Sequence, residues 1–315
     1  MAKITSQAGN LTTDGEPLVQ PCDLEPAPWA RQIAGGTAQR RQADTVELTV
    51  TPGSAAAALI SARLVGAAAL DVADFQKGVT NCYRQIAQAA GALGQAHPVR
   101  FWNYLPAIHQ QMDDRRDRYM VFNEGRYTAW RQWFGEPGEW SGRLPAASGI
   151  GHAGDDLVIH CLALDRPGVG LENPRQTPTY RYSHRYGPRP PCFARAMLID
   201  HPLDHRPALL ISGTASIRGE KSVHVDDLRN QLAETRANLQ ALLAAAGKPS
   251  GVPNWALTEL RVYHVRGGDA AAIHAFVRGH LAPSARLQLR QAVLCRADLR
   301  VEIEGLARPE PTEGG

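Results

Sequence analysis

Apolar and polar residues follow two rhythms along this chain, one that repeats every second residue and one that repeats every three or four. In the second half, apolar residues at helical spacing predict a long helix over 223–246, ended by Gly247. A shorter helix is expected to begin at Asp269. Short apolar or alternating runs predict strands at 195–199, 208–217, 259–266, 286–296 and 299–306.

The first half has the same order of elements. Its expected strands are 45–51, 58–65, 99–104 and 156–164, and its expected helices are 71–90 and 118–134. The last strands of the two halves, 156–164 and 298–306, align without a gap, and an Arg-Pro pair follows each. In this alignment His160 corresponds to Glu302. The repetition predicts a duplicated α+β unit.

The polar and Pro-rich stretches predict the boundaries of these units. Residues 1–44 are expected to be an irregular lead segment, and 309–315 a disordered tail. An N-terminal domain over 45–165 and a C-terminal domain over 192–308 are expected on either side of 166–191. That stretch is rich in Pro and Arg and too long for a tight turn, so it is a linker or a functional loop.

The composition excludes several classes of protein. A chain of 315 residues with 43% hydrophobic residues is long enough for two domains with a sizeable core. The net charge is only +3, without a basic run, so nucleic acid is not an expected partner. The five cysteines are spread out, as expected of reduced thiols in the cytoplasm. No apolar leader is seen, and the apolar stretch at 55–70 is broken by Arg63, so no membrane is expected.

Motifs for metals and cofactors are also missing from the sequence. His201 and His205 lie close together but have no evident third ligand, so no metal site is expected. Ser212 and Ser216 lack the setting of a nucleophile elbow. No G-x-G-x-x-G or P-loop motif is present, so no cofactor is expected.

Segments between residues 100 and 306 resemble the chorismatases, which cleave chorismate and are built on RidA-like units. They are RFWNYLP at 100–106, FNEGR at 122–126, YRY at 180–182, YGPRP at 186–190, FARA at 193–196, SGTASI at 212–217 and the stretch 295–305. The resemblance implies two RidA/YjgF-like (chorismate-mutase-like barrel) units in tandem. Their mixed sheets would carry helices on one face, with sites in clefts between units.

The resemblance also implies roles for single residues. Glu302 matches the catalytic acid of the family, and Arg126, Arg195 and Tyr180 match residues that bind the substrate. Arg195 interrupts an apolar strand, so its charge must face a cleft or a partner. Tyr182 is near enough that the choice between it and Tyr180 stays open.

The alternation of side-chain directions along the last expected strand bears on the role of Glu302. Leu299, Val301 and Ile303 face one way, whereas Arg300, Glu302 and Glu304 face the other. For a glutamate on a strand, a solvated polar face is the ordinary interpretation. The family motif overrides that interpretation for Glu302 alone, so Glu304 is interpreted as structural.

The residues implied by the resemblance suit the chemistry of chorismate. This substrate carries two carboxylates, a ring hydroxyl and an enolpyruvyl ether. Acid cleavage of the ether needs a proton on the methylene carbon, and a carboxylic acid with a raised pKa is its natural donor. Arginine binds carboxylates through two parallel hydrogen bonds.

Gly213 and Cys295 match the family members that form 3-hydroxybenzoate without net hydrolysis. A glycine would let the ring lie deeper, so that its own hydroxyl replaces water as the attacking group. The expected function is therefore removal of pyruvate from chorismate to give 3-hydroxybenzoate, with some 4-hydroxybenzoate as an option. Alternatives are hydrolysis to 3,4-dihydroxycyclohexa-1,5-dienoate, or a non-catalytic RidA-like protein that binds a small acid. A monomer or a small homo-oligomer is expected.

Overall fold

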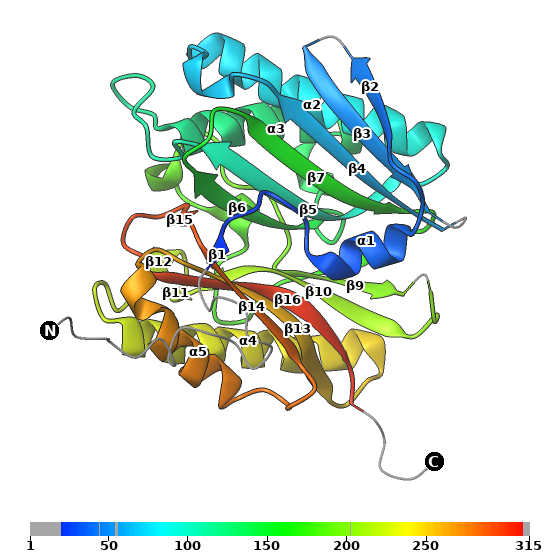
Figure 1. Ribbon diagram of the computed structural model, residues 1–315. Helices are drawn as coiled ribbons and strands as arrows, with labels where there is room; N and C mark the ends of the chain where they lie inside the picture. Colours follow the sequence, from blue (N-terminus) through cyan, green and yellow to red (C-terminus); the bar gives the residue numbers. More distant parts are fainter. Residues whose placement is uncertain (1–19, 44, 54–55, 202, 311–315) are drawn as a thin grey trace, which may run out of the picture.

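Two seven-stranded sheets form the centre of the computed structural model, which describes residues 20–43, 45–53, 56–201 and 203–310. The inner faces of the sheets pack against each other through a shared apolar cluster. Helices α2 and α3 cover the outer face of one sheet, and α4 and α5 cover the outer face of the other (Figure 1). The expected fold class, two α+β units in tandem with helices on one face of each mixed sheet, is confirmed.

The first sheet has the strand order β15-β6-β5-β7-β4-β3-β2. Asp71 and Asp117 begin its two helices, because each side chain accepts a hydrogen bond from a backbone N–H in the first turn. The elements of this unit are β2 Gln39–Ala43, β3 Val46–Pro52, β4 Ala57–Leu64, α2 Val72–Ala92, β5 His97–Pro106, α3 Arg118–Phe134, β6 Ala146–His152 and β7 Leu157–Leu164.

The second sheet has the strand order β1-β14-β13-β16-β10-β9-β8. Its elements are β1 Gln20–Pro21, β8 Val169–Leu171, β9 Ala196–Asp200, β10 Pro207–Ala215, α4 Leu228–Ser250, β13 Trp255–His264, α5 Ala270–Arg278, β14 Arg286–Gln291 and β16 Val301–Pro309. A small hairpin is formed by β11 Ile217–Arg218 and β12 Lys221–Ser222. Single 3-10 turns lie at Ala67–Ala69, Pro137–Glu139, Thr179–Arg181, His184–Tyr186 and Gly267–Asp269.

The two sheets are equivalent strand by strand. The order β6-β5-β7-β4-β3-β2 in the first matches β14-β13-β16-β10-β9-β8 in the second. Trp102 is opposite His160 in the first unit, and Tyr263 is opposite Glu302 in the second. His160 on β7 and Glu302 on β16 therefore lie on equivalent strands, each opposite an aromatic residue of the neighbouring strand.

The expectation of an irregular segment before residue 45 is wrong for the part that the structure describes. Helix α1, Pro28–Ala34, has Pro28 in its first turn and buries Trp29 and Ile33 between the sheets. The Trp29 and Trp102 ring centroids are 5.4 Å apart. Strand β2 then pairs with β3. The tail expected at 309–315 lies, from residue 311 onward, outside the described residues.

Three local expectations are corrected by the structure. Helix α4 does not end at Gly247 but continues to Ser250, and Gly251 ends it with a φ of 68°. The expected strand 286–296 is divided, because β15, Val293–Leu294, leaves the second sheet and pairs with β6 of the first. Strand β6 was not expected at all, since its sequence AASGIGH has little apolar pattern.

None of the helices in the described ranges has the length and apolar character needed to cross a membrane.

Candidate active site

A cavity of about 510 Å³ opens between the two units. Helix α3 and strand β6 of the first unit form one wall, and β10 and β16 of the second form the other. The loops around 182–195 and 295–298 close its sides. Five of the six site residues predicted from the sequence line this cavity, namely Glu302, Arg126, Arg195, Gly213 and Cys295.

Glu302 projects from β16 toward the first unit and is only 4% exposed. Its neighbours Val301 and Ile303 face the helices on the other side of the sheet, as the alternation predicts. Burial, and after it the nearby negative charge of Glu304, raise the pKa of the Glu302 carboxyl to about 8. At neutral pH this carboxyl is therefore mostly protonated and can donate a proton.

Gly213 lies directly beneath the Glu302 carboxyl. Any Cβ atom at position 213 would overlap Oε1 of Glu302. The backbone N–H of Gly213 donates to Oγ of Ser148, at 3.0 Å, which ties this part of β10 to β6 of the other unit. The absence of a side chain at position 213 thus determines where the Glu302 carboxyl lies. This effect is separate from any room that the glycine leaves for a substrate ring.

A buried ion pair lies next to the acid. Arg100 Nη2 is 2.7 Å from Glu304 Oε2, and their side chains are 1% and 2% exposed. The Ser148 hydroxyl joins the pair, since it accepts from Arg100 at 2.7 Å and donates to Glu304 at 2.5 Å. Trp102 and Tyr263 donate to the other carboxylate oxygen, at 3.0 and 3.2 Å. The Glu304 carboxylate is thus held by groups from both units.

This arrangement adds to the prediction for Glu304, which the sequence marked only as structural. Glu304 does not line the cavity, but its charge favours the protonated form of Glu302. Arg100 acts in the opposite direction on the pKa of Glu302. Arg195 and Arg296 act in the same direction as Arg100, so burial and Glu304 raise the pKa of Glu302 against three arginines that lower it.

Arg126 enters the cavity from α3 with a side chain that is 2% exposed. Its guanidinium lies over the rings of Phe122 and Phe193, at 5.1 and 6.0 Å. Nη2 donates to Oδ1 of Asn123 at 2.7 Å, and the buried Nε has no hydrogen-bond partner in the described structure.

Arg195 of the second unit lies over the Phe193 ring, which Arg126 also contacts. It is 3% exposed, and its guanidinium lies 5.5 Å from the Phe193 ring. Its Nη2 donates to the hydroxyl of Tyr182 at 2.6 Å and to the carbonyl of Thr177 at 3.2 Å. Within the described ranges no carboxylate lies within ion-pair distance of Arg126 or Arg195. Two buried cations without a protein anion favour a ligand that carries negative charge.

Of the two tyrosines left open by the sequence, Tyr182 lines the cavity and Tyr180 does not. Tyr182 lines the cavity and is bonded to Arg195, and its ring lies 5.2 Å from that of Tyr186. Tyr180, the residue predicted from the sequence, does not line the cavity but packs against the core of the first unit. The two side chains diverge because residues 179–181 form a 3-10 turn.

Cys295 lies on the side of the cavity next to Tyr119. Burial raises the pKa of its thiol to about 12, so the sulfur is uncharged at neutral pH. Among the described residues, no group of three or more His, Cys, Asp or Glu is arranged to hold a metal ion.

Other cavity residues were not singled out from the sequence. Ser148 lies on the strand that the apolar pattern did not indicate, so nothing local pointed to it. Arg296 follows Cys295 in a segment of the resemblance, and its guanidinium lies over the Tyr186 ring at 4.1 Å. Its Nη1 donates to the carbonyl of Glu220 at 2.8 Å. Tyr119 also lines the cavity and meets the other residues only in the folded chain.

Comparison with known proteins relates these features to one family. Residues 42–163 match a family model described as "Chorismatase FkbO/Hyg5-like, N-terminal". A 3-hydroxybenzoate synthase of Streptomyces hygroscopicus is 35% identical over 225 residues, which are 68% of this chain and 64% of that protein. The alignment with this relative thus spans slightly less than two thirds of its length.

A second relative is covered more fully. A chorismatase of Streptomyces rapamycinicus is 31% identical over 74% of this chain and 70% of its own length. Among solved structures, a chorismatase crystal structure superposes with a TM-score of 0.73 and 26% identity. That match covers 85% of this chain and 78% of the other.

Proposed function

The chain belongs to the chorismatase family, and from this premise we propose that it removes pyruvate from chorismate to give 3-hydroxybenzoate. The observation that carries the proposal is the combination in one cavity of a protonated buried carboxyl, Glu302, with two buried arginines that have no carboxylate partner in the described chain. Chorismate is a dianion with an acid-labile enol ether, so it matches both parts of this site.

In the proposed reaction, Arg126 and Arg195 hold the two carboxylates of the substrate, and Tyr182 supports Arg195. Phe193 lies against both guanidinium groups, which restricts their positions. Glu302 gives its proton to the methylene carbon of the enolpyruvyl group, and the neighbouring ether carbon becomes an oxocarbenium centre. A donor with a pKa of about 8 is protonated at neutral pH, as this step requires.

The ring hydroxyl then adds to the oxocarbenium carbon in place of water. As this bond forms, the hydroxyl proton passes to the Glu302 carboxylate. The bond from the ring carbon to the former hydroxyl oxygen and the bond from the pyruvyl carbon to the ether oxygen then break, so pyruvate leaves with the hydroxyl oxygen and the ether oxygen stays on the ring. The ring carbon that bears the ether oxygen loses its proton, that oxygen gains one, and the ring becomes aromatic. The sum is chorismate to 3-hydroxybenzoate plus pyruvate, with no water consumed. Gly213 and Cys295 support this outcome, because both are small residues on the wall of the cavity and leave room for the ring beside the acid.

We place the protein in the cytoplasm, since all five cysteines are free thiols, as a reducing compartment would keep them. Chorismate is the proposed partner, without nucleic acid or membrane. The site is built from both units of one chain, so a monomer suffices for the reaction.

The experiment that tests the proposal is incubation of the purified protein with chorismate and separation of the products. We expect 3-hydroxybenzoate and pyruvate in equal amounts. Pyruvate with 3,4-dihydroxycyclohexa-1,5-dienoate would retain the acid chemistry but overturn the assignment of product. Absence of pyruvate, with chorismate binding in a calorimeter, would replace the enzyme by a protein that only binds small acids.

A further inference from the structure

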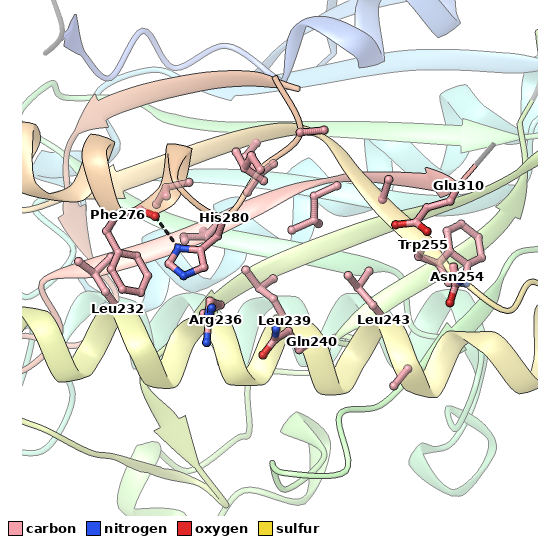
Figure 2. A pocket seen from close by; sticks show the side chains of 18 of the residues that line it. Leu232, Arg236, Leu239, Gln240, Leu243, Asn254, Trp255, Phe276, His280 and Glu310 are labelled. Carbon is pink, nitrogen blue, oxygen red and sulfur yellow. Dashed lines mark hydrogen bonds between the residues drawn. The ribbon is translucent and has the colours of Figure 1, made fainter. Parts of the chain in front are cut away.

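A second large hollow lies on the outer face of the second sheet, away from the cavity with Glu302. It measures about 490 Å³ and is bounded by α4 on one side, α5 on the other and strands β13 and β16 beneath (Figure 2). We call it the α4 groove. Its floor and walls are mostly apolar and include Leu232, Leu239, Leu243, Leu260, Phe276 and Ile303.

The groove exists because the two units differ in their second helix. In the first unit, α3 has 17 residues and packs along α2, and its buried Trp130 and Phe134 belong to the core there. In the second unit, α5 has only 9 residues and makes no comparable contact with α4. The space that the longer helix occupies in the first unit is therefore left between α4 and α5 in the second.

Charges divide the groove into two ends. Arg236 lies near His280 and Phe276 at one end, whereas Glu310 lies at the other end beside Asn254 and Trp255 (Figure 2). Arg236 is exposed and forms no ion pair or hydrogen bond with any part of the chain that the structure describes. An anionic group is favoured at the Arg236 end and disfavoured at the Glu310 end.

The volume and length of the α4 groove indicate the kind of molecule that it can bind. A volume of about 490 Å³ falls in the range of roughly 300–1,000 Å³ that is typical of small-molecule pockets. A docked helix is about 10 Å in diameter and needs more room. From Arg236 to Ala244, both of which line the groove, α4 rises about 12 Å at about 1.5 Å per residue. The site thus suits a narrow, extended molecule with one charged end.

We propose that the α4 groove binds a monocarboxylate with an unbranched apolar chain, its carboxylate at Arg236 and its chain along α4 toward Trp255. The chain would contact Leu239 and Leu243, which point into the groove from α4 (Figure 2). This inference is independent of the proposed reaction, since Ile303 in the floor faces the helices, whereas Glu302 faces the other unit.

Titration calorimetry with hexanoate, octanoate and decanoate tests this proposal on the full chain. Each buried methylene is expected to raise the affinity about fourfold, so decanoate binds roughly 15-fold more tightly than octanoate. Equal affinities for the three acids, or no binding of decanoate at millimolar concentration, would overturn the proposal. The Glu302→Gln variant is expected to bind decanoate like the wild type, which separates this result from the fate of the proposed reaction.

Two variants on one helix locate the site. Ala244→Phe, whose ring would fill the groove, is expected to weaken decanoate binding at least tenfold. Ala233→Phe is the matched control, because Ala233 is an exposed alanine of α4 outside the groove, and it should change the affinity less than twofold. Equal effects of the two variants would overturn the location.

A third variant tests the polarity of the site. Arg236→Gln should lower the affinity for decanoate at least fivefold while the affinity for decanol stays unchanged. A loss shared equally by the acid and the alcohol would overturn the role of the arginine.

Discussion

Glu302 and Glu304 project from the same face of β16, yet only Glu304 has a cation within ion-pair distance in the described chain, with Arg100 Nη2 at 2.7 Å. Burial, and after it the nearby Glu304 carboxylate, raise the pKa of Glu302 and keep the proton on this unpaired glutamate. A carboxyl that keeps its proton at neutral pH is what acid catalysis next to a dianion requires.

This relationship predicts the pH dependence of the Glu304→Gln variant. With a pKa of about 8, Glu302 is active below pH 8, and the rate of the wild type should fall above it. Loss of the Glu304 charge removes one cause of the raised pKa of Glu302 and leaves Arg100, Arg195 and Arg296 to lower it, so the fall in rate should begin at lower pH. The pH profile of kcat/KM measures this. A profile that does not move would contradict the electrostatic role.

The Glu302→Gln variant should separate activity from stability. We expect pyruvate release to fall roughly 10²- to 10⁴-fold, the usual contribution of a general acid. Glu259→Gln is a matched control, because burial also raises the pKa of Glu259 but it lies outside the cavity. The control should keep at least half of the wild-type rate in a coupled pyruvate assay.

The Glu302→Gln variant should be more stable than the wild type at alkaline pH. The folded state holds the Glu302 proton up to about pH 8, whereas the unfolded chain loses it in the usual carboxyl range. The wild type therefore loses stability as the pH rises through this window, by about 1.4 kcal/mol for each unit of the shift. Glutamine has no proton to lose. The melting temperatures of the wild type and the variant should be equal at pH 4, and that of the variant should be higher at pH 8.5.

Gly213→Ala tests the position of the acid. The new methyl group would overlap the Glu302 carboxyl, which must then rotate away from the substrate. We expect kcat to fall at least tenfold, corresponding to about 1.4 kcal/mol or more. In Gly268→Ala, the matched control, the added methyl meets open space and the rate should not change. If Gly213→Ala kept the rate and product of the wild type, the prediction that catalysis depends on the position of the Glu302 carboxyl would be wrong.

Two tyrosines two positions apart provide a paired test of the binding site. Tyr182→Phe removes the hydroxyl that accepts from Arg195, so KM for chorismate should rise roughly tenfold with little change in kcat. Tyr180→Phe should leave KM within twofold, since that residue packs outside the cavity. Steady-state kinetics on both variants decide the matter, and the reverse result would restore Tyr180 as the binding residue.

Much of the fold could be predicted from the sequence, because secondary structure depends on the spacing of apolar residues near one another. Helix α3 begins and ends at the predicted residues, and the alternation along β16 placed Glu302 opposite the helices. The repeated order of elements predicted two similar units, and the family motifs pointed to Arg126 and Arg195. Helix bounds, strand alternation and motifs all depend on residues near one another in the chain, so they can be predicted from the sequence.

The tertiary structure alone decided which distant residues meet. Arg100 and Glu304 are separated by 204 positions, and Ser148 reaches both from a strand that no local pattern indicated. Gly213 lies where the register between β10 and β16 shifts, and the Glu302 carboxyl lies where a Cβ at this position would be. Register and packing between units depend on contacts far apart in the chain, and spacing along the sequence carries no measure of them.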